Sequence, residues 1–143
     1  MKRQAISLIS LLSLLLVAGS AIAQTSPMHA NVPFSFTVGD KTVPAGSYTI
    51  GALGRTPEML LLQATDGSSP MIVGSNSVRN LNGANKTKLV FNRYNDHYFL
   101  SEIWVQGATS GRQIPKTSQE KELAKELAAN RTHERVEIVA GLY

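Results

Sequence analysis

Apolar and polar residues alternate along most of the chain with the period of two that is typical of half-buried β-strands. The first such stretch predicts a strand over residues 32–38, whose apolar face would hold Val32, Phe34, Phe36 and Val38. Pro33 cannot donate to a strand ladder, which favours an edge position or the start of the strand. Gly39-Asp40 suits a two-residue hairpin turn with glycine first, and residues 41–43 form the predicted return strand.

Pro44-Ala45-Gly46 is a strong local turn signal. Proline presets the φ angle of a type I turn, and the glycine can take the left-handed conformation of a three-residue hairpin loop. A strand is predicted to follow over residues 47–50. Residues 59–64 and 71–73 are apolar runs on either side of a polar loop, and we predict that they pair as strands.

The strongest predicted hairpin lies in the middle of the chain, over residues 89–94 and 98–105. Before it, residues 75–86 are rich in asparagine and are predicted to be an exposed loop with a tight turn at Asn82-Gly83. Both strands of the hairpin carry apolar residues on both faces, as central strands of a sandwich or closed barrel do. Their register stays open, and Trp104 is predicted to lie in the core.

The period changes to that of a helix after a connector over residues 107–116. Thr117 and Glu120 match a capping box, in which each side chain satisfies a free backbone N–H of the first turn. An amphipathic helix is predicted over residues 118–130, with an apolar stripe of Leu123, Ala124, Leu127 and Ala128. A last strand follows, whose inner face would hold Val136, Ile138 and Ala140.

These elements predict a mainly β fold, a single antiparallel β-sandwich or partly closed barrel with one C-terminal amphipathic helix. The folded domain is expected to span residues 32–143 and to include the helix over 118–130.

Residues 1–23 have the three parts of a secretory signal peptide: a basic start, an apolar region over 6–18, and the cleavage motif Ala21-Ile22-Ala23. Residues 24–31 would then form a flexible lead-in. The apolar region is shorter than the about 20 residues that span a membrane. We therefore expect an exported protein, periplasmic or extracellular, without a transmembrane anchor after cleavage.

Net charge and cysteine content exclude several classes of function. The chain carries 14 basic and 10 acidic residues, and loss of Lys2 and Arg3 with the leader leaves a net charge of 12 − 10 = +2. The remaining basic residues are dispersed, so no nucleic-acid partner is expected. The chain has no cysteine, which excludes disulfides, thiolate metal sites and cysteine nucleophiles.

Motifs for catalysis or metal binding are missing from the sequence. The histidines are far apart and lack metal-motif spacing: His29, His97 and His133. No serine has the flanks of a nucleophile elbow. We predict no metal, no cofactor and no enzymatic activity, and we interpret the helix carboxylates as solvating charges: Glu120, Glu122 and Glu126.

Aromatic and basic side chains cluster around the central hairpin, and such combinations are used to bind sugars, polymers and proteins. We consider them a candidate partner surface made of Arg93, Tyr94, Tyr98, Arg112 and Lys116. The alternative interpretation is that the large aromatic residues of the hairpin are core and the charges are merely exposed.

A distinctive run opens the domain: Val32-Pro33-Phe34-x-Phe36-x-Val38-Gly39-x-Lys41-x-x-Pro44-Ala45-Gly46-x-Tyr48. Later segments are Arg93-Tyr94, Tyr98-Phe99-Leu100 and Ile103-Trp104. Together they resemble a family of small exported bacterial proteins that are largely uncharacterised. The resemblance implies export and a β-rich domain, and it implies no activity. The Pro-Ala-Gly-x-Tyr segment alone is also similar to hairpins of carboxypeptidase-regulatory-like sandwiches.

The expected role is that of an exported, non-catalytic interaction or structural module of the bacterial envelope or secretome. Its partner would be a protein, a polysaccharide or a small apolar ligand. One alternative is a β-barrel that binds a small apolar ligand in an unfilled interior. Another is an unrecognised hydrolase, which would need His97 or His133 beside a carboxylate in one cleft.

Export can be tested by mass spectrometry of the secreted or periplasmic protein. If residues 1–23 are a cleaved leader, the mature N-terminus is Gln24. A cytoplasmic chain that retains Met1 would contradict this prediction.

Overall fold

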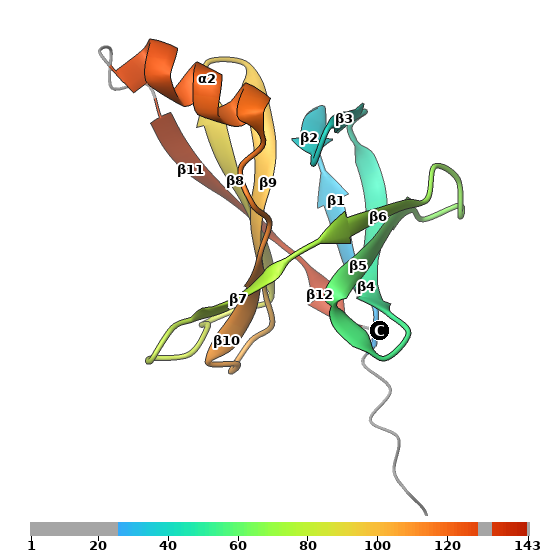
Figure 1. Ribbon diagram of the computed structural model, residues 1–143. Helices are drawn as coiled ribbons and strands as arrows, with labels where there is room; N and C mark the ends of the chain where they lie inside the picture. The colour runs from blue at the N-terminus through green and yellow to red at the C-terminus, as the bar shows by residue number, and fades with distance from the viewer. Residues whose placement is uncertain (1–25, 129–132, 143) are drawn as a thin grey trace, which may run out of the picture.

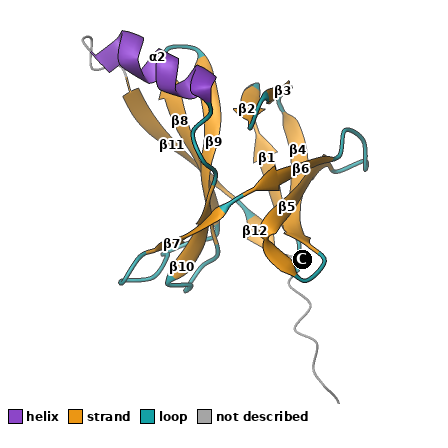
Figure 2. Cartoon of the chain, viewed as in Figure 1, coloured by secondary structure: helices purple, strands orange, loops and turns teal. Residues whose placement is uncertain are grey.

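Two β-sheets pack face to face as a sandwich that is not closed into a barrel, with one helix at one end (Figures 1 and 2). This computed structural model describes residues 26–128 and 133–142, so the predicted leader lies outside the described residues. The prediction of a mainly β fold, a sandwich or partly closed barrel with one C-terminal helix, is confirmed, and of the two alternatives the structure is consistent with the sandwich.

The five-stranded sheet has the spatial order β12 (Gly141–Leu142), β1 (Met28–Val32), β4 (Gly46–Leu53), β5 (Thr56–Ala64) and β6 (Met71–Gly74). The seven-stranded sheet has the order β11 (His133–Val139), β8 (Lys88–Tyr94), β9 (His97–Trp104), β10 (Ser110–Gln113) and β7 (Asn76–Arg79). Beside β9 it also holds the hairpin of β2 (Phe36–Val38) and β3 (Lys41–Val43). The helix is α2 (Ser118–Ala128).

Two of the crossings between the sheets take a single residue: β6 is followed by β7, and β11 is followed by β12. The first crossing bends at Ser75, whose backbone N–H donates to the carbonyl oxygen of Glu58 at 2.8 Å. Arg112 also donates to the carbonyl oxygen of Ser75 at 2.9 Å. At the second crossing, the N–H of Ala140 donates to the carbonyl oxygen of Thr87 at 3.0 Å. These bonds satisfy backbone groups that leave one ladder before they join the other.

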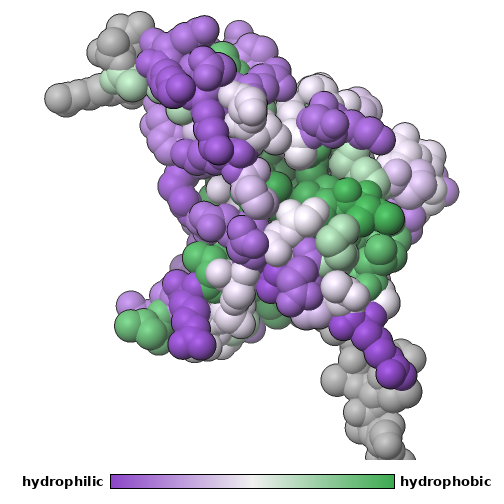
Figure 3. Space-filling model, viewed as in Figure 1, coloured by the Kyte–Doolittle hydropathy of each residue, from purple (hydrophilic) through white to green (hydrophobic). Residues whose placement is uncertain are grey.

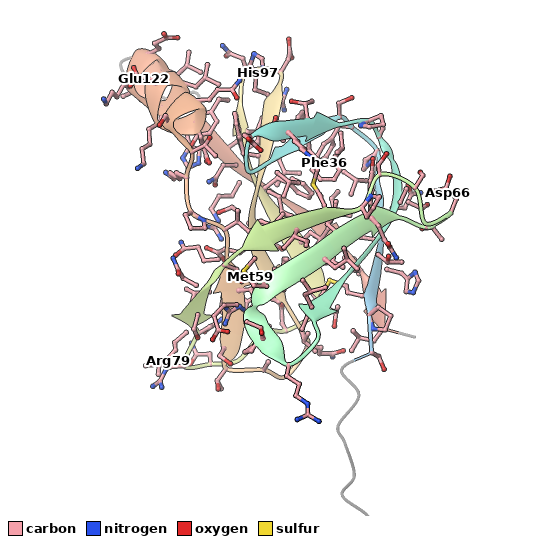
Figure 4. All side chains as sticks on the ribbon, turned by 45° about the vertical axis from the view of Figure 1, so that its right-hand side comes forward. Phe36, Met59, Asp66, Arg79, His97 and Glu122 are labelled. Atoms are coloured by element: carbon pink, nitrogen blue, oxygen red, sulfur yellow. The ribbon has the colours of Figure 1, made fainter. Side chains whose placement is uncertain are left out.

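The main core fills the space between the sheets with apolar side chains from both. Phe36 lies in this interior (Figure 4). Its ring makes edge contacts with the rings of Tyr48 at 5.2 Å and Phe91 at 5.3 Å between centroids. The Tyr48 hydroxyl donates to the carbonyl oxygen of Pro44. The interior is therefore packed with side chains, with aromatic contacts at its centre.

A β-bulge in β9 decides which residues face this core. Val90 pairs with Glu102 and the next residue, Phe91, pairs with Leu100, so Ser101 is an extra residue in β9. Leu100 before the bulge and Ile103 after it both pack in the main core. The bulge explains why the sequence pattern left the register of this hairpin open.

The opposite face of the seven-stranded sheet carries a second, smaller core. Trp104, which is 6% exposed, packs there with Val90, Ala84 and half-buried Val78. Its indole lies directly over Gly111, where a Cβ atom would be 2.7 Å from the ring and 2.8 Å from the Ile103 carbonyl oxygen. Trp104 is thus buried as predicted, but outside the main core.

Other predicted elements are confirmed. Strands pair as expected in the β2–β3, β5–β6 and β8–β9 hairpins and in β11. Gly39 has a φ of 61° in the first of these turns. The predicted helix is observed as α2, and residues 129–130 of the prediction lie outside the described residues. Two predictions are wrong in part: the loop predicted over 75–86 contains β7, and the connector predicted over 107–116 contains β10, because these two segments pair with each other.

The lead-in predicted over 24–31 is wrong for residues 28–31, which belong to β1 between β4 and β12. The strand predicted over 32–38 is also wrong at its centre. Residues 33–35 leave the ladder because the chain passes here from the five-stranded sheet to the seven-stranded sheet. Pro33 suits this step because it has no N–H to leave unpaired.

The hairpin predicted at Pro44-Ala45-Gly46 is wrong. The segment links β3 of one sheet to β4 of the other. Gly46 does not have a positive φ angle, and it pairs with Val32 instead. The proline bends the chain between sheets rather than within one.

The close contact between Trp104 and Gly111 can be tested with a single methyl group. Gly111→Ala should destabilise the protein by about 1–3 kcal/mol in chemical denaturation, because the indole or the backbone must move. Gly74→Ala is the matched control in another strand, where an added Cβ meets nothing within 4 Å. Equal stability of the two variants would contradict the packing described here.

Candidate functional site

A buried carboxylate joins α2 to the seven-stranded sheet. Glu120 lies in the first turn of α2 and is only 4% exposed. Its Oε1 accepts hydrogen bonds from the Asn92 Nδ2 at 2.9 Å and from the Tyr94 hydroxyl at 3.2 Å. A buried charge is tolerated when hydrogen bonds replace its water, and both donors here come from β8.

The start of α2 holds this carboxylate in place. The Thr117 Oγ1 accepts a hydrogen bond from the Glu120 N–H at 3.3 Å, which is one half of the predicted capping box. The Glu120 side chain does not complete the other half, because it turns to the sheet. Its position in the first turn also sets its negative charge against the positive end of the helix dipole.

Asn92 extends the network to β11. Its Oδ1 lies 3.2 Å from the Nε2 of His133. Because the Asn92 nitrogen donates to Glu120, its oxygen must accept, so the His133 Nε2 carries a proton. The His133 ring also stacks on the Tyr94 ring, with centroids 5.1 Å apart and an angle of 18° between the planes. Three elements, β8, β11 and α2, therefore share one polar cluster.

A hollow of about 400 Å³ lies beside this cluster, and we call it the α2 groove. Its lining residues are Tyr94, Lys116, Ala124, Leu127, Ala128 and His133. One wall is the apolar stripe of α2, which includes two small alanines and is only partly covered by the sheet. The other wall is the stacked pair of Tyr94 and His133. Lys116 adds a cation.

Burial raises the pKa of Tyr94 to about 12, and the negative charge of Glu120 and their hydrogen bond act in the same direction. The Tyr94 hydroxyl is therefore neutral at physiological pH and remains a donor to Glu120.

A second hollow of about 320 Å³ lies on the same face of the sheet, beside Trp104. Glu102 accepts hydrogen bonds there from the Trp104 Nε1 at 2.8 Å and from Arg135 at 3.1 and 3.3 Å. Burial opposes ionisation of Glu102, but these hydrogen bonds and the charges of Arg135 and Lys88 outweigh it and lower its pKa. The Glu102 carboxylate is thus already engaged by the protein itself.

The structure separates the predicted partner surface. Tyr94 is 1% exposed and lies under α2, so it is not a surface residue. Arg93 lies over the Tyr98 ring at 5.4 Å, and the Tyr98 ring also stacks on Phe34 next to the main core. Arg112 holds Ser75 at the crossing between sheets. Of the five, the α2 groove brings together Tyr94 and Lys116.

The described residues contain no group of three histidine or acidic side chains placed to hold a metal ion. His97 is exposed at the start of β9, at the same end of the molecule as the helix residue Glu122 (Figure 4). The hydrogen bond described for His133 leads to an amide rather than to a carboxylate.

An apolar patch covers part of the outer face of the five-stranded sheet (Figure 3). Ile72 is 57% exposed in it and pairs directly with Leu61. The surface over α2 is mainly polar in the same view (Figure 3). Within residues 26–128 and 133–142, no helix combines the length and apolar character needed to cross a membrane.

Comparison of the chain with protein-family models, with curated proteins and with solved structures found no match. Assignment of the site therefore depends on its geometry.

Sequence reasoning missed Glu120 by treating it as a solvating charge. A signal was present, because Glu120 precedes Leu123, Ala124 and Leu127 by three, four and seven residues and so shares their helix face. An acidic residue within an apolar stripe indicates a buried polar contact. Asn92 shows the same signal in β8, because it is a polar residue between Val90 and Tyr94 on one face of the strand.

The tyrosine hydrogen bond can be tested by Tyr94→Phe, which keeps the ring and removes the hydroxyl. We expect a loss of about 1.5–3 kcal/mol at pH 7, as for hydrogen bonds to charged groups. The unfolded tyrosine ionises near pH 10 and the folded one near 12, so the wild type should lose stability as pH rises through this range.

Tyr94→Phe should lose less of its remaining stability over this alkaline range. It should retain a small loss, because burial also raises the pKa of Tyr48. Tyr98→Phe is the control and should behave like the wild type in urea titrations from pH 7 to pH 11. An alkaline loss unchanged in Tyr94→Phe would contradict the described network.

Proposed function

We propose that this chain is an exported, non-catalytic binding module and that its binding site is the α2 groove. The predicted leader supports export, and the groove supports binding. The observation that carries the proposal is a hollow of about 400 Å³ between the partly covered apolar stripe of α2 and the Tyr94–His133 stack. This volume is within the range of about 300–1,000 Å³ that is usual for ligand sites.

The chemistry of the lining also favours binding. Ala124, Leu127 and Ala128 offer an apolar wall that a ligand could remove from water, with a gain of about 25 cal/mol per Å². The polar groups beside them are already bonded: Glu120 to β8, and His133 to Asn92. They fix the shape of the groove, which is a property of a preorganised binding site.

For a small apolar ligand, which is expected from the sequence, the α2 groove is a better site than the space between the sheets. That space is occupied by the packed main core. An apolar group could therefore enter at α2 without opening the sandwich.

Binding can be tested with Nile red, a neutral dye whose fluorescence increases in apolar surroundings. Ala124→Trp would fill the groove with an indole and should lower Nile red affinity at least about tenfold, a cost of about 1.4 kcal/mol. Lys121→Trp is the matched control, because it adds the same residue on the exposed face of α2. It should bind as the wild type does.

Circular dichroism should show that both variants keep the fold. If Nile red does not bind the wild type, or if both variants bind it equally well, the α2 groove is not the binding site. Binding that is instead lost in Ile72→Lys would assign the dye to the patch on the five-stranded sheet.

A further inference from the structure

We propose that the α2 groove selects ligands that combine an apolar body with a single carboxylate, such as medium-chain fatty acids. The inference rests on the proposed function and names the ligand class for the same site. The groove is lined by two kinds of side chain, the apolar wall on α2 and the exposed cationic side chain of Lys116. A ligand that matches both must be an amphiphile.

Lys116 supplies the selectivity for an anion. It lies two residues before the first turn of α2, and the ion pairs found among the described residues do not include it. The nearby acidic group, Glu120, already accepts from Asn92 and Tyr94 and does not bond to Lys116. The Lys116 cation is thus left for a group that comes from outside.

The apolar wall restricts the rest of the ligand. Ala124 and Ala128 are one turn apart, and their small side chains leave space along the helix that Leu127 borders. A flat imidazole and phenol stack forms the opposite side. An alkyl chain or an aromatic ring fits between such walls, whereas a sugar would leave its hydroxyl groups without partners.

Octanoate, octylamine and 1-octanol form a test set with the same alkyl chain and a negative, positive or neutral head. Each is titrated against the full mature chain with Nile red in the groove, below the concentration at which the probe forms micelles. Octanoate should displace the dye at the lowest concentration. Octylamine should be the weakest competitor, because Lys116 repels its ammonium group.

Lys116→Met keeps the length of the side chain and removes its charge. It should weaken octanoate at least about threefold relative to 1-octanol in the same variant, consistent with a partly exposed ion pair. Lys121→Met is the matched control on the exposed face of α2 and should leave octanoate binding as in the wild type.

Failure of this inference can be separated from failure of the proposed function. If Nile red binds in the groove but the three probes compete equally, or if Lys116→Met has no effect on octanoate, the selectivity for a carboxylate is wrong and the groove remains a binding site. If the wild type binds neither Nile red nor any probe, both proposals fail.

Discussion

The side chains that β9 sends to each face of the seven-stranded sheet depend on the single extra residue that the strand inserts at Ser101. A regular strand would send Leu100 and Ile103 to opposite faces, whereas the bulge brings both into the main core. The residues between and after them then point outward, where Glu102 and Trp104 form the second core with its salt bridge. The sheet therefore has two covered faces, one against the other sheet and one against α2 and the loop around Ala84.

On that outer face, α2 is attached in a way that leaves the groove open. A helix held by large apolar side chains would close onto the sheet, but the stripe of α2 includes Ala124 and Ala128. The closest polar connection is the Glu120 carboxylate, which reaches β8 at one end of the helix. The helix residues that line the groove, Ala124, Leu127 and Ala128, all follow this contact in the chain. The small side chains of Ala124 and Ala128 therefore weaken the packing of α2 and also create the space in which we propose that a ligand binds.

Elements with a long apolar periodicity were predicted from the sequence. Elements whose position is set by tertiary contacts were missed. The β8–β9 hairpin and α2 followed from their patterns, but the bulge at Ser101 has no local signature. Strands β7 and β10 pair with each other along an edge and contain mostly polar residues, so no alternation identified them. Strand β1 did alternate, with Met28, Ala30 and Val32 buried, and its small central residue made the pattern easy to overlook.

Glu120 holds α2 to a sandwich whose main core contains no residue of the helix. Native-state hydrogen exchange measures this directly, because it reports the opening of each element separately. In the wild type, the amides of α2 should be less protected than those of Leu89 to Tyr94. In Glu120→Ala, protection of α2 should fall at least about tenfold, as expected for the loss of hydrogen bonds to a charged group, while β8 stays more protected than α2 and the exposed-site control Glu122→Ala leaves both unchanged. Protection of α2 equal to that of β8 in the wild type, or no loss in α2 in Glu120→Ala, would contradict the account.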